Sequence, residues 1–112
     1  MKIIRYQTAS GELAYGVRHP DGQTTRLTGE LFGELTDTGE PASIGKLLAP
    51  LEPCDIICIG LNYRKHAAEG KQPIPEWPIV FMKNSGSLQH PGDPIVLPRQ
   101  LKSDAVDYEC EL

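Results

Sequence analysis

Residues 55–69 read DIICIGLNYRKHAAE, and the stretch changes character at its glycine. The first part is a short isoleucine-rich run, which predicts a buried strand. Asn62 can then cap a short helix that runs through His66 to Glu69. Gly70 follows as the helix stop. We therefore expect a strand that leads directly into about two helical turns.

His66 and Glu69 are spaced i, i+3, so on a helix they share a face and come within reach of each other. A carboxylate beside an imidazole fixes its tautomer and favours its charged form, which suits a general base near neutral pH. An exposed i, i+3 pair of little energetic consequence explains the spacing equally well.

Residues 107–112 read DYECEL and carry a second acidic cluster. In an extended strand side chains alternate between faces, so Asp107, Glu109 and Glu111 share one face. Like charges on one strand need a compensating partner, and Mg²⁺ prefers carboxylate oxygens. A solvated edge strand that uses charge to discourage pairing with another chain is the alternative.

Four segments in this order resemble the fumarylacetoacetate hydrolase family, in its bacterial branch with a short N-terminal domain. The resemblance runs from about Asp55 to Leu112 and rests on IGLNYRKHAAE (59–69), PIVFMKNS (78–85), PGDPIVLP (91–98) and VDYECEL (106–112). This branch includes enzymes similar to 2-hydroxyhepta-2,4-diene-1,7-dioate isomerase and acylpyruvase.

The resemblance implies a site for Mg²⁺ or Mn²⁺. Glu109 and Glu111 fall on the two glutamates of the family's E-x-E strand. The third family ligand, an aspartate from a later segment, has no counterpart before Leu112. Cys110 replaces a small residue between the glutamates, and we expect it to pack rather than to bind a hard, oxygen-preferring ion.

The resemblance also implies catalytic and substrate-binding residues. His66 falls on the family's histidine and Glu69 on the acid that pairs with it, which implies activation of water or movement of a proton. Lys83 falls on a recurring lysine that would place an anionic substrate, although a surface lysine at a strand end is the alternative. Tyr63 and Arg64 lie beside the histidine, and an arginine can bind a carboxylate in bidentate fashion.

The implied substrates are small enolisable 2-oxo or β-dicarbonyl acids, as in aromatic catabolism. The implied reactions are C–C bond hydrolysis, isomerisation or decarboxylation through a metal-stabilised enolate, in a homodimeric enzyme. The rival hypothesis is a non-catalytic β-domain fragment that keeps the family motifs for structure or for partner binding.

The expected fold is mainly β (α+β). We expect a small N-terminal antiparallel β domain at residues 1–50. Residues 55–112 would form the first part of a catalytic domain with the family's mixed β-barrel or roll, truncated at Leu112. Such a fragment would be inactive alone, since half of its core would be absent.

Within residues 1–50, strand-like runs span Lys2–Gln7, Leu13–Arg18 and Thr24–Leu27, separated by turn residues. Ser43–Leu48 predicts a short helix, with a serine cap and a proline two residues beyond its end.

After residue 70 the chain is rich in loop residues. Ile79–Lys83 and Ile95–Leu97 predict short strands. Trp77 is expected to pack a proline-rich loop onto the domain. His19 and His90 each precede a proline, and we expect both on the surface.

The composition excludes several classes of protein. Eleven basic residues against 15 acidic ones give a net charge of −4, with no basic run suited to nucleic acid. No apolar run approaches the roughly 20 residues that span a bilayer, and the N-terminus lacks a signal-peptide core. An odd number of cysteines without metal-site spacing favours reduced thiols in the cytoplasm, with Cys58 in the core: Cys54, Cys58 and Cys110.

Overall fold

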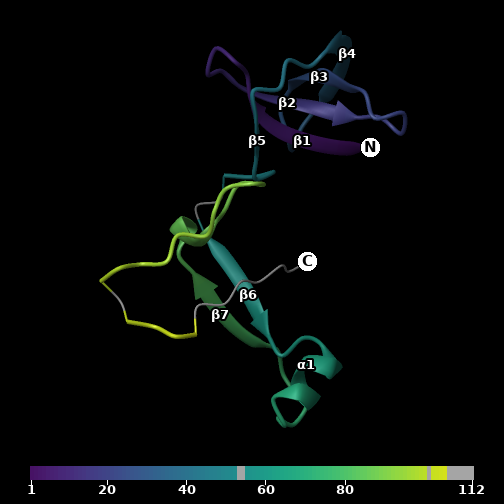
Figure 1. Ribbon diagram of the computed structural model, residues 1–112. Helices are drawn as coiled ribbons and strands as arrows, with labels where there is room; N and C mark the ends of the chain where they lie inside the picture. Colours follow the sequence, from purple (N-terminus) through teal and green to yellow (C-terminus); the bar gives the residue numbers. More distant parts are fainter. Residues whose placement is uncertain (53–54, 101, 106–112) are drawn as a thin grey trace.

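The computed structural model describes residues 1–52, 55–100 and 102–105 (Figure 1). They form a five-stranded sheet, a two-stranded hairpin and very little helix. The predicted mainly β fold is confirmed. The expected metal ligands Glu109 and Glu111 lie outside the described residues.

The five-stranded sheet is antiparallel and has the strand order β4-β3-β2-β1-β5. The first two strands have the predicted bounds, and the third extends two residues further. The strands are β1 (Lys2–Gln7), β2 (Leu13–Arg18), β3 (Thr24–Gly29), β4 (Leu35–Pro41) and β5 (Lys46–Leu48).

The core of this sheet lies against one face of β1. Side chains alternate along a strand, so Ile4 and Tyr6 point the same way and pack with Ala14 of β2. Tyr6 is only 1% exposed, which makes it the best-buried large side chain of the sheet. Arg5 faces the opposite side, where it is also buried and pairs with Glu52 just after β5.

The predicted helix at Ser43–Leu48 is wrong, because the last three of these residues form β5. Leu47 pairs with Tyr6 across the ladder between β5 and β1. A Cβ on Gly45 would lie 2.9 Å from the carbonyl carbon of Thr8, so the chain passes close to the β1–β2 turn here. The long-range pairing with β1 therefore overrides the local helix signals.

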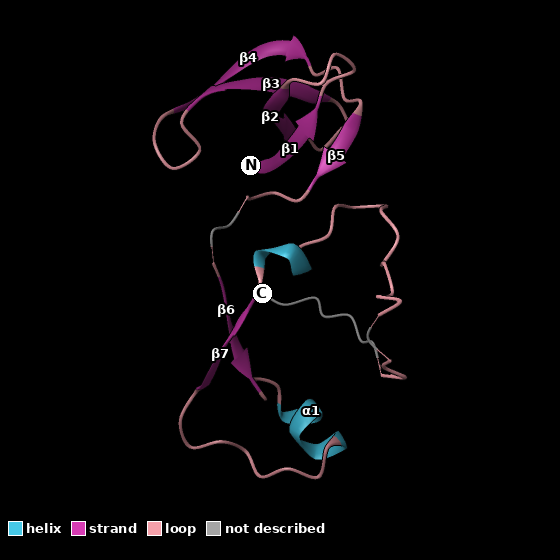
Figure 2. Cartoon of the chain, turned by 90° about the vertical axis from the view of Figure 1, so that its left-hand side faces the viewer, coloured by secondary structure: helices cyan, strands magenta, loops and turns pink. Residues whose placement is uncertain are grey.

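The second unit is an antiparallel hairpin of β6 (Ile56–Gly60) and β7 (Ile79–Lys83). The helix α1 (Arg64–Glu69) lies in the connection between them, and a short 3₁₀ turn, η1 (Ser85–Ser87), follows β7. Figure 2 shows α1 at one end of the hairpin, where β6 ends and β7 begins.

One face of the hairpin is aliphatic and open to solvent. Ile57 pairs with Met82 and Ile59 with Val80, and all four side chains are exposed. The prediction of a buried strand therefore fails for this face. It holds for Cys58 on the other face, which is 6% exposed, as expected of a core residue.

Three further expectations are wrong. The N-cap residue of α1 is Tyr63, and no side chain caps the helix, so Asn62 does not have the predicted role. Trp77 is 77% exposed and does not pack its loop onto the described part of the domain. Residues Ile95–Leu97 lie in no strand.

The two units make an elongated molecule. The radius of gyration is 18.2 Å, against about 13 Å for a compact domain of this length. Within the described ranges, no helix is long and apolar enough to cross a membrane.

Candidate functional site

The end of β6 and the start of α1 position the predicted catalytic residues. Leu61 adopts a positive φ of 50° directly after β6, which turns the chain out of the sheet and into the helix. Ala67 is fully buried, so it anchors α1, while His66 and Glu69 remain exposed. One buried alanine thus fixes which face of α1 meets solvent.

This exposed face borders an open depression of about 630 Å³. The predicted base His66 and its partner Glu69 line this depression. The two predicted substrate contacts, Tyr63 and Arg64, line it as well, so the structure brings these four residues together. The complete lining is Asn62, Tyr63, Arg64, Lys65, His66 and Glu69.

His66 and Glu69 line the depression without touching each other. Neither a hydrogen bond nor an ion pair joins these two described side chains. Both side chains are exposed, and the i, i+3 spacing keeps them within reach of each other. An imidazole, a carboxylate and the Arg64 guanidinium therefore line one open depression.

Lys83 lies away from this group. It pairs with Ile56 at one end of the hairpin, whereas Gly60 and Ile79 pair at the other end, next to α1. Four residues of strand span on the order of 13 Å. The Lys83 ammonium lies over the ring of Phe81, 5.5 Å from its centroid.

No group of three or more metal-ligating side chains converges within residues 1–52, 55–100 and 102–105. Glu109 and Glu111 belong to the segment outside these ranges. Their carboxylate oxygens are nevertheless the donor type that Mg²⁺ and Mn²⁺ prefer, so the donor set fits the implied ion chemically.

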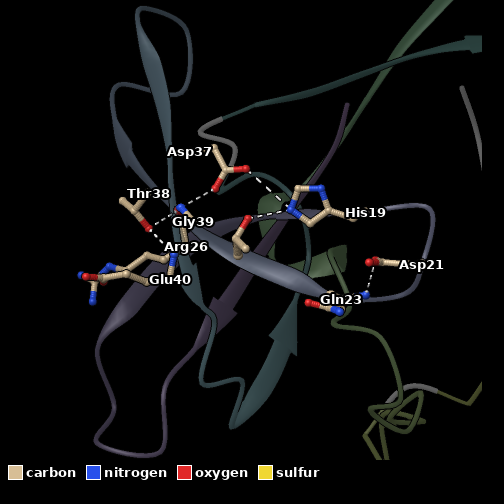
Figure 3. Close-up of polar contacts among 9 residues, drawn as sticks. His19, Asp21, Gln23, Arg26, Asp37, Thr38, Gly39 and Glu40 are labelled. Atoms are coloured by element: carbon tan, nitrogen blue, oxygen red, sulfur yellow. Dashed lines mark hydrogen bonds and ion pairs between the residues drawn. The ribbon is translucent and has the colours of Figure 1, made fainter.

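A polar cluster that the sequence analysis missed joins β3, β4 and the β2–β3 turn (Figure 3). The Nε2 of His19 lies 2.7 Å from Thr25 Oγ1 and 3.6 Å from Asp37 Oδ2. Hydrogen bonds from the Thr25 hydroxyl and the Gly39 amide, together with the nearby His19, lower the pKa of Asp37, although partial burial opposes them. His19 is therefore half-buried and bonded, not simply a surface residue.

A bulge in β4 makes this cluster possible. Leu27 pairs with Asp37 and Thr25 with Pro41, so β4 has three unpaired residues opposite Arg26. Thr38 Oγ1 donates to the Arg26 carbonyl at 2.9 Å across the bulge. Nothing local in the sequence indicates this, since β4 itself lacks an alternating apolar pattern.

The His19 cluster does not have the geometry of a catalytic triad. In a triad, a carboxylate orients one imidazole nitrogen while the other nitrogen faces the nucleophile. Here the hydroxyl and the carboxylate approach the same nitrogen. We therefore assign the cluster to stabilisation of the sheet.

Comparison with known proteins covers both units. Residues 55–112, just over half of the chain, match the family described as Fumarylacetoacetate (FAA) hydrolase C-terminal. Residues 1–50 match the family described as Rv2993c-like, N-terminal.

Individual relatives agree with these matches. A Dictyostelium discoideum protein named Fumarylacetoacetate hydrolase domain-containing protein 2 homolog is 54% identical over 67 residues, or 60% of this chain and 21% of that protein. The human protein named Oxaloacetate tautomerase FAHD2A, mitochondrial, is 42% identical over 73 residues, which cover 64% of this chain and 23% of that protein.

A solved structure of an uncharacterized protein from Mycobacterium abscessus superposes with a TM-score of 0.68 at 31% identity. The superposition covers 91% of this chain and 40% of that protein. The chain thus spans well under half the length of each of these three relatives. By its match over residues 55–112, the chain belongs to the fumarylacetoacetate hydrolase family.

Proposed function

We propose that this chain contributes the base and part of the substrate pocket of an enzyme that tautomerises a small 2-oxo acid of the oxaloacetate type. The observation that carries the proposal is the shared depression on α1. His66, Glu69 and Arg64 all line this depression, and all three belong to the part of the chain that matches the family. The names of the vertebrate relatives, Oxaloacetate tautomerase, indicate the reaction.

Keto–enol tautomerisation moves one proton and breaks no carbon–carbon bond. His66 would take a proton from the carbon beside the substrate carbonyl, and the proton would return at the carbonyl oxygen. Glu69 would hold the imidazole in its basic tautomer when the two side chains approach each other. Proton removal and return balance, so no other reactant is needed.

Arg64 would bind a substrate carboxylate. A guanidinium presents two parallel N–H donors to a carboxylate, which fixes the direction of the acid over His66. Tyr63, which is half exposed at the rim, offers its phenol as an additional donor. Lys83, at the far end of the hairpin, would contact only the remote end of a longer substrate.

Glu109 and Glu111 would hold Mg²⁺ or Mn²⁺ through their carboxylates. The chemistry that such an ion supplies when bound is polarisation of the substrate carbonyl as a Lewis acid. The residues of α1 would provide the proton transfer.

The experiment uses the protein expressed from its complete open reading frame. The enol absorbance of oxaloacetate is followed with Mg²⁺ and with chelator, while NMR identifies the products. Faster loss of the enol with intact oxaloacetate supports tautomerisation. Cleavage into two acids, or release of CO₂, would reassign the reaction to hydrolysis or decarboxylation within the family.

His66→Asn should lower the metal-dependent rate by about 10²–10⁴-fold, the usual contribution of a general base. Lys65→Gln is the matched control, since Lys65 lines the same depression without a proposed role. Equal rates for the two variants would remove His66 from the mechanism. Absence of turnover on oxaloacetate and acylpyruvates would favour the non-catalytic hypothesis.

A further inference from the structure

A tight turn after β7 brings a histidine and an aspartate to the N-terminal sheet. Residues 90–93 read HPGD, and the amide of Asp93 donates to the carbonyl of His90 at 3.1 Å. Gly92 has a φ of 82° and follows a proline, which is the signature of a type II turn. Gln89 closes the base of the turn, because its side-chain amide donates to the carbonyl of Pro94.

The first and last residues of this turn both bind the β5 segment. The Nζ of Lys46 lies 2.7 Å from Asp93 Oδ2. The amide of Ala49, one residue beyond β5, donates to His90 Nδ1 at 3.1 Å. In Figure 1 the light-green segment that follows β7 comes up to the lower end of β5. These contacts join residues more than 40 positions apart.

The bond to His90 depends on the protonation state of the imidazole. An imidazole nitrogen accepts a hydrogen bond only while it carries no proton, and the imidazolium ion donates from both nitrogens. Protonated His90 would therefore present a donor to the amide of Ala49. Ala49 is 2% exposed, so its amide would have no ready access to solvent as a substitute acceptor.

The other charged groups nearby do not replace this bond. Lys46 of β5 and Asp93 of the turn neutralise each other in their own ion pair. Arg5 of β1 and Glu52 likewise pair with each other. Among the described residues, the acceptor for the buried amide is thus the neutral imidazole.

The three histidines differ in this respect. His19 contacts a hydroxyl and a carboxylate, both of which can accept from a protonated ring. His66 is exposed on α1. Only His90 has a contact that protonation must break.

We propose that the contacts of His90 and Asp93 with the β5 segment form a proton-sensitive clasp between the two units of the chain. The clasp is closed while His90 is neutral. Protonation opens the contact with Ala49, and of these two contacts the Lys46–Asp93 ion pair remains. The clasp does not depend on the proposed catalytic activity.

The test is an NMR pH titration of the ¹⁵N-labelled protein expressed from its complete open reading frame. The imidazole resonances of His90 report its ionisation. Hydrogen exchange gives the protection factor of the Ala49 amide. The protection factor is used because it corrects for the intrinsic pH dependence of the exchange rate. We expect that protection factor to fall at least tenfold as His90 becomes protonated. The amide of Ile4 in β1 should stay protected, which shows that the sheet remains folded.

Two variants distinguish the role of His90 as a hydrogen-bond acceptor from its role in packing. His90→Asn offers a side-chain oxygen at every pH, so the Ala49 protection factor should no longer follow acidification. His90→Ala should lower it at every pH. His19→Asn is the matched control and should leave the response of Ala49 unchanged. Protection of Ala49 that survives protonation of His90, or that survives His90→Ala, would overturn the proposal.

Discussion

The Nε2 of His19 lies 3.6 Å from Oδ2 of Asp37, which ties the β2–β3 turn to the bulged strand β4. Neither residue is fully buried, yet the contact joins the edge strand β4 to the turn that precedes β3. The strand β4 pairs with β3 alone, so it depends on such side-chain contacts more than the inner strands do.

Replacement of this aspartate should make the stability of the sheet less dependent on pH. The pKa of Asp37 is lowered in the folded state, so its stabilising effect is present above the ordinary pKa of 3.8. The effect is lost as the pH falls through the lowered value. Asp37→Asn should therefore reduce the melting temperature near pH 7, and the difference from the parent protein should shrink as the pH falls below 3.8.

Thermal unfolding followed by circular dichroism across this pH range measures the effect. Glu30→Gln is a suitable control, because Glu30 is exposed and its side chain makes no hydrogen bond or ion pair within the described residues. If the melting temperatures of Asp37→Asn and the parent protein differed by the same amount at every pH, the lowered pKa of Asp37 would not be the source of the stabilisation.

Two glycines with positive φ should respond differently to alanine. A Cβ at Gly29 would lie 2.0 Å from the carbonyl oxygen of Glu34, whereas a Cβ at Gly22 would meet nothing within 4 Å. Gly22→Ala should cost only the backbone strain of its positive φ, about 1–2 kcal/mol. Gly29→Ala should cost more, because the β3–β4 turn cannot close around the added carbon.

Chemical denaturation of both variants gives the two free energies of unfolding. Equal losses would show that the backbone at Gly29 shifts freely enough to admit a methyl group.

The stability of the five-stranded sheet should depend strongly on Tyr6, the one aromatic residue of its buried cluster with Ile4 and Ala14. Tyr6 is 1% exposed and contacts Ile4 and Ala14, so Tyr6→Ala should lower the free energy of unfolding by about 3 kcal/mol or more. Phe32, 90% exposed in the β3–β4 turn, is the matched control, and Phe32→Ala should stay within about 0.5 kcal/mol. If Tyr6→Ala and Phe32→Ala lowered the free energy of unfolding by similar amounts, Tyr6 would not be a core residue of the sheet.

Metal binding should stabilise the protein expressed from its complete open reading frame. An ion that binds only the folded state raises the free energy of unfolding by about 2.7 kcal/mol at 100 times its Kd. We expect Mg²⁺ to raise the melting temperature, and Glu109→Gln to abolish the rise. Glu76→Gln, at an exposed loop position, should respond like the parent. An undiminished response of Glu109→Gln would exclude this carboxylate as a ligand.

Local pattern was enough to predict β1, β2 and β7, each of which carries several apolar residues. A turn that contains glycine follows each of Lys2–Gln7 and Leu13–Arg18, and both strands have the predicted limits. Leu35–Pro41 escaped prediction because it is polar and bulged, as befits an edge strand with a solvated surface. Its position is set by pairing with β3 and by the Asp37 contacts.

Residues 43–48 show most clearly what local sequence cannot predict. Ser43 and Pro50 carry genuine helix signals, but the segment forms a strand because β1 offers an unpaired edge beside it. No window of local sequence contains that information. Likewise, the shared depression on α1 follows from the helix spacing, whereas the distance of Lys83 from it follows from hairpin register.

The position of β1 between β2 and β5 has a consequence for synthesis. β1 leaves the ribosome before either of its partners. Synthesis of β2 is complete at Arg18, which pairs one edge of β1, but the partner of the other edge is complete only at Leu48. Because chains are made at about 5–20 residues per second, β1 carries one open edge for seconds, during which a foreign strand can occupy it. The nascent sheet is therefore most exposed to misassembly at its oldest strand.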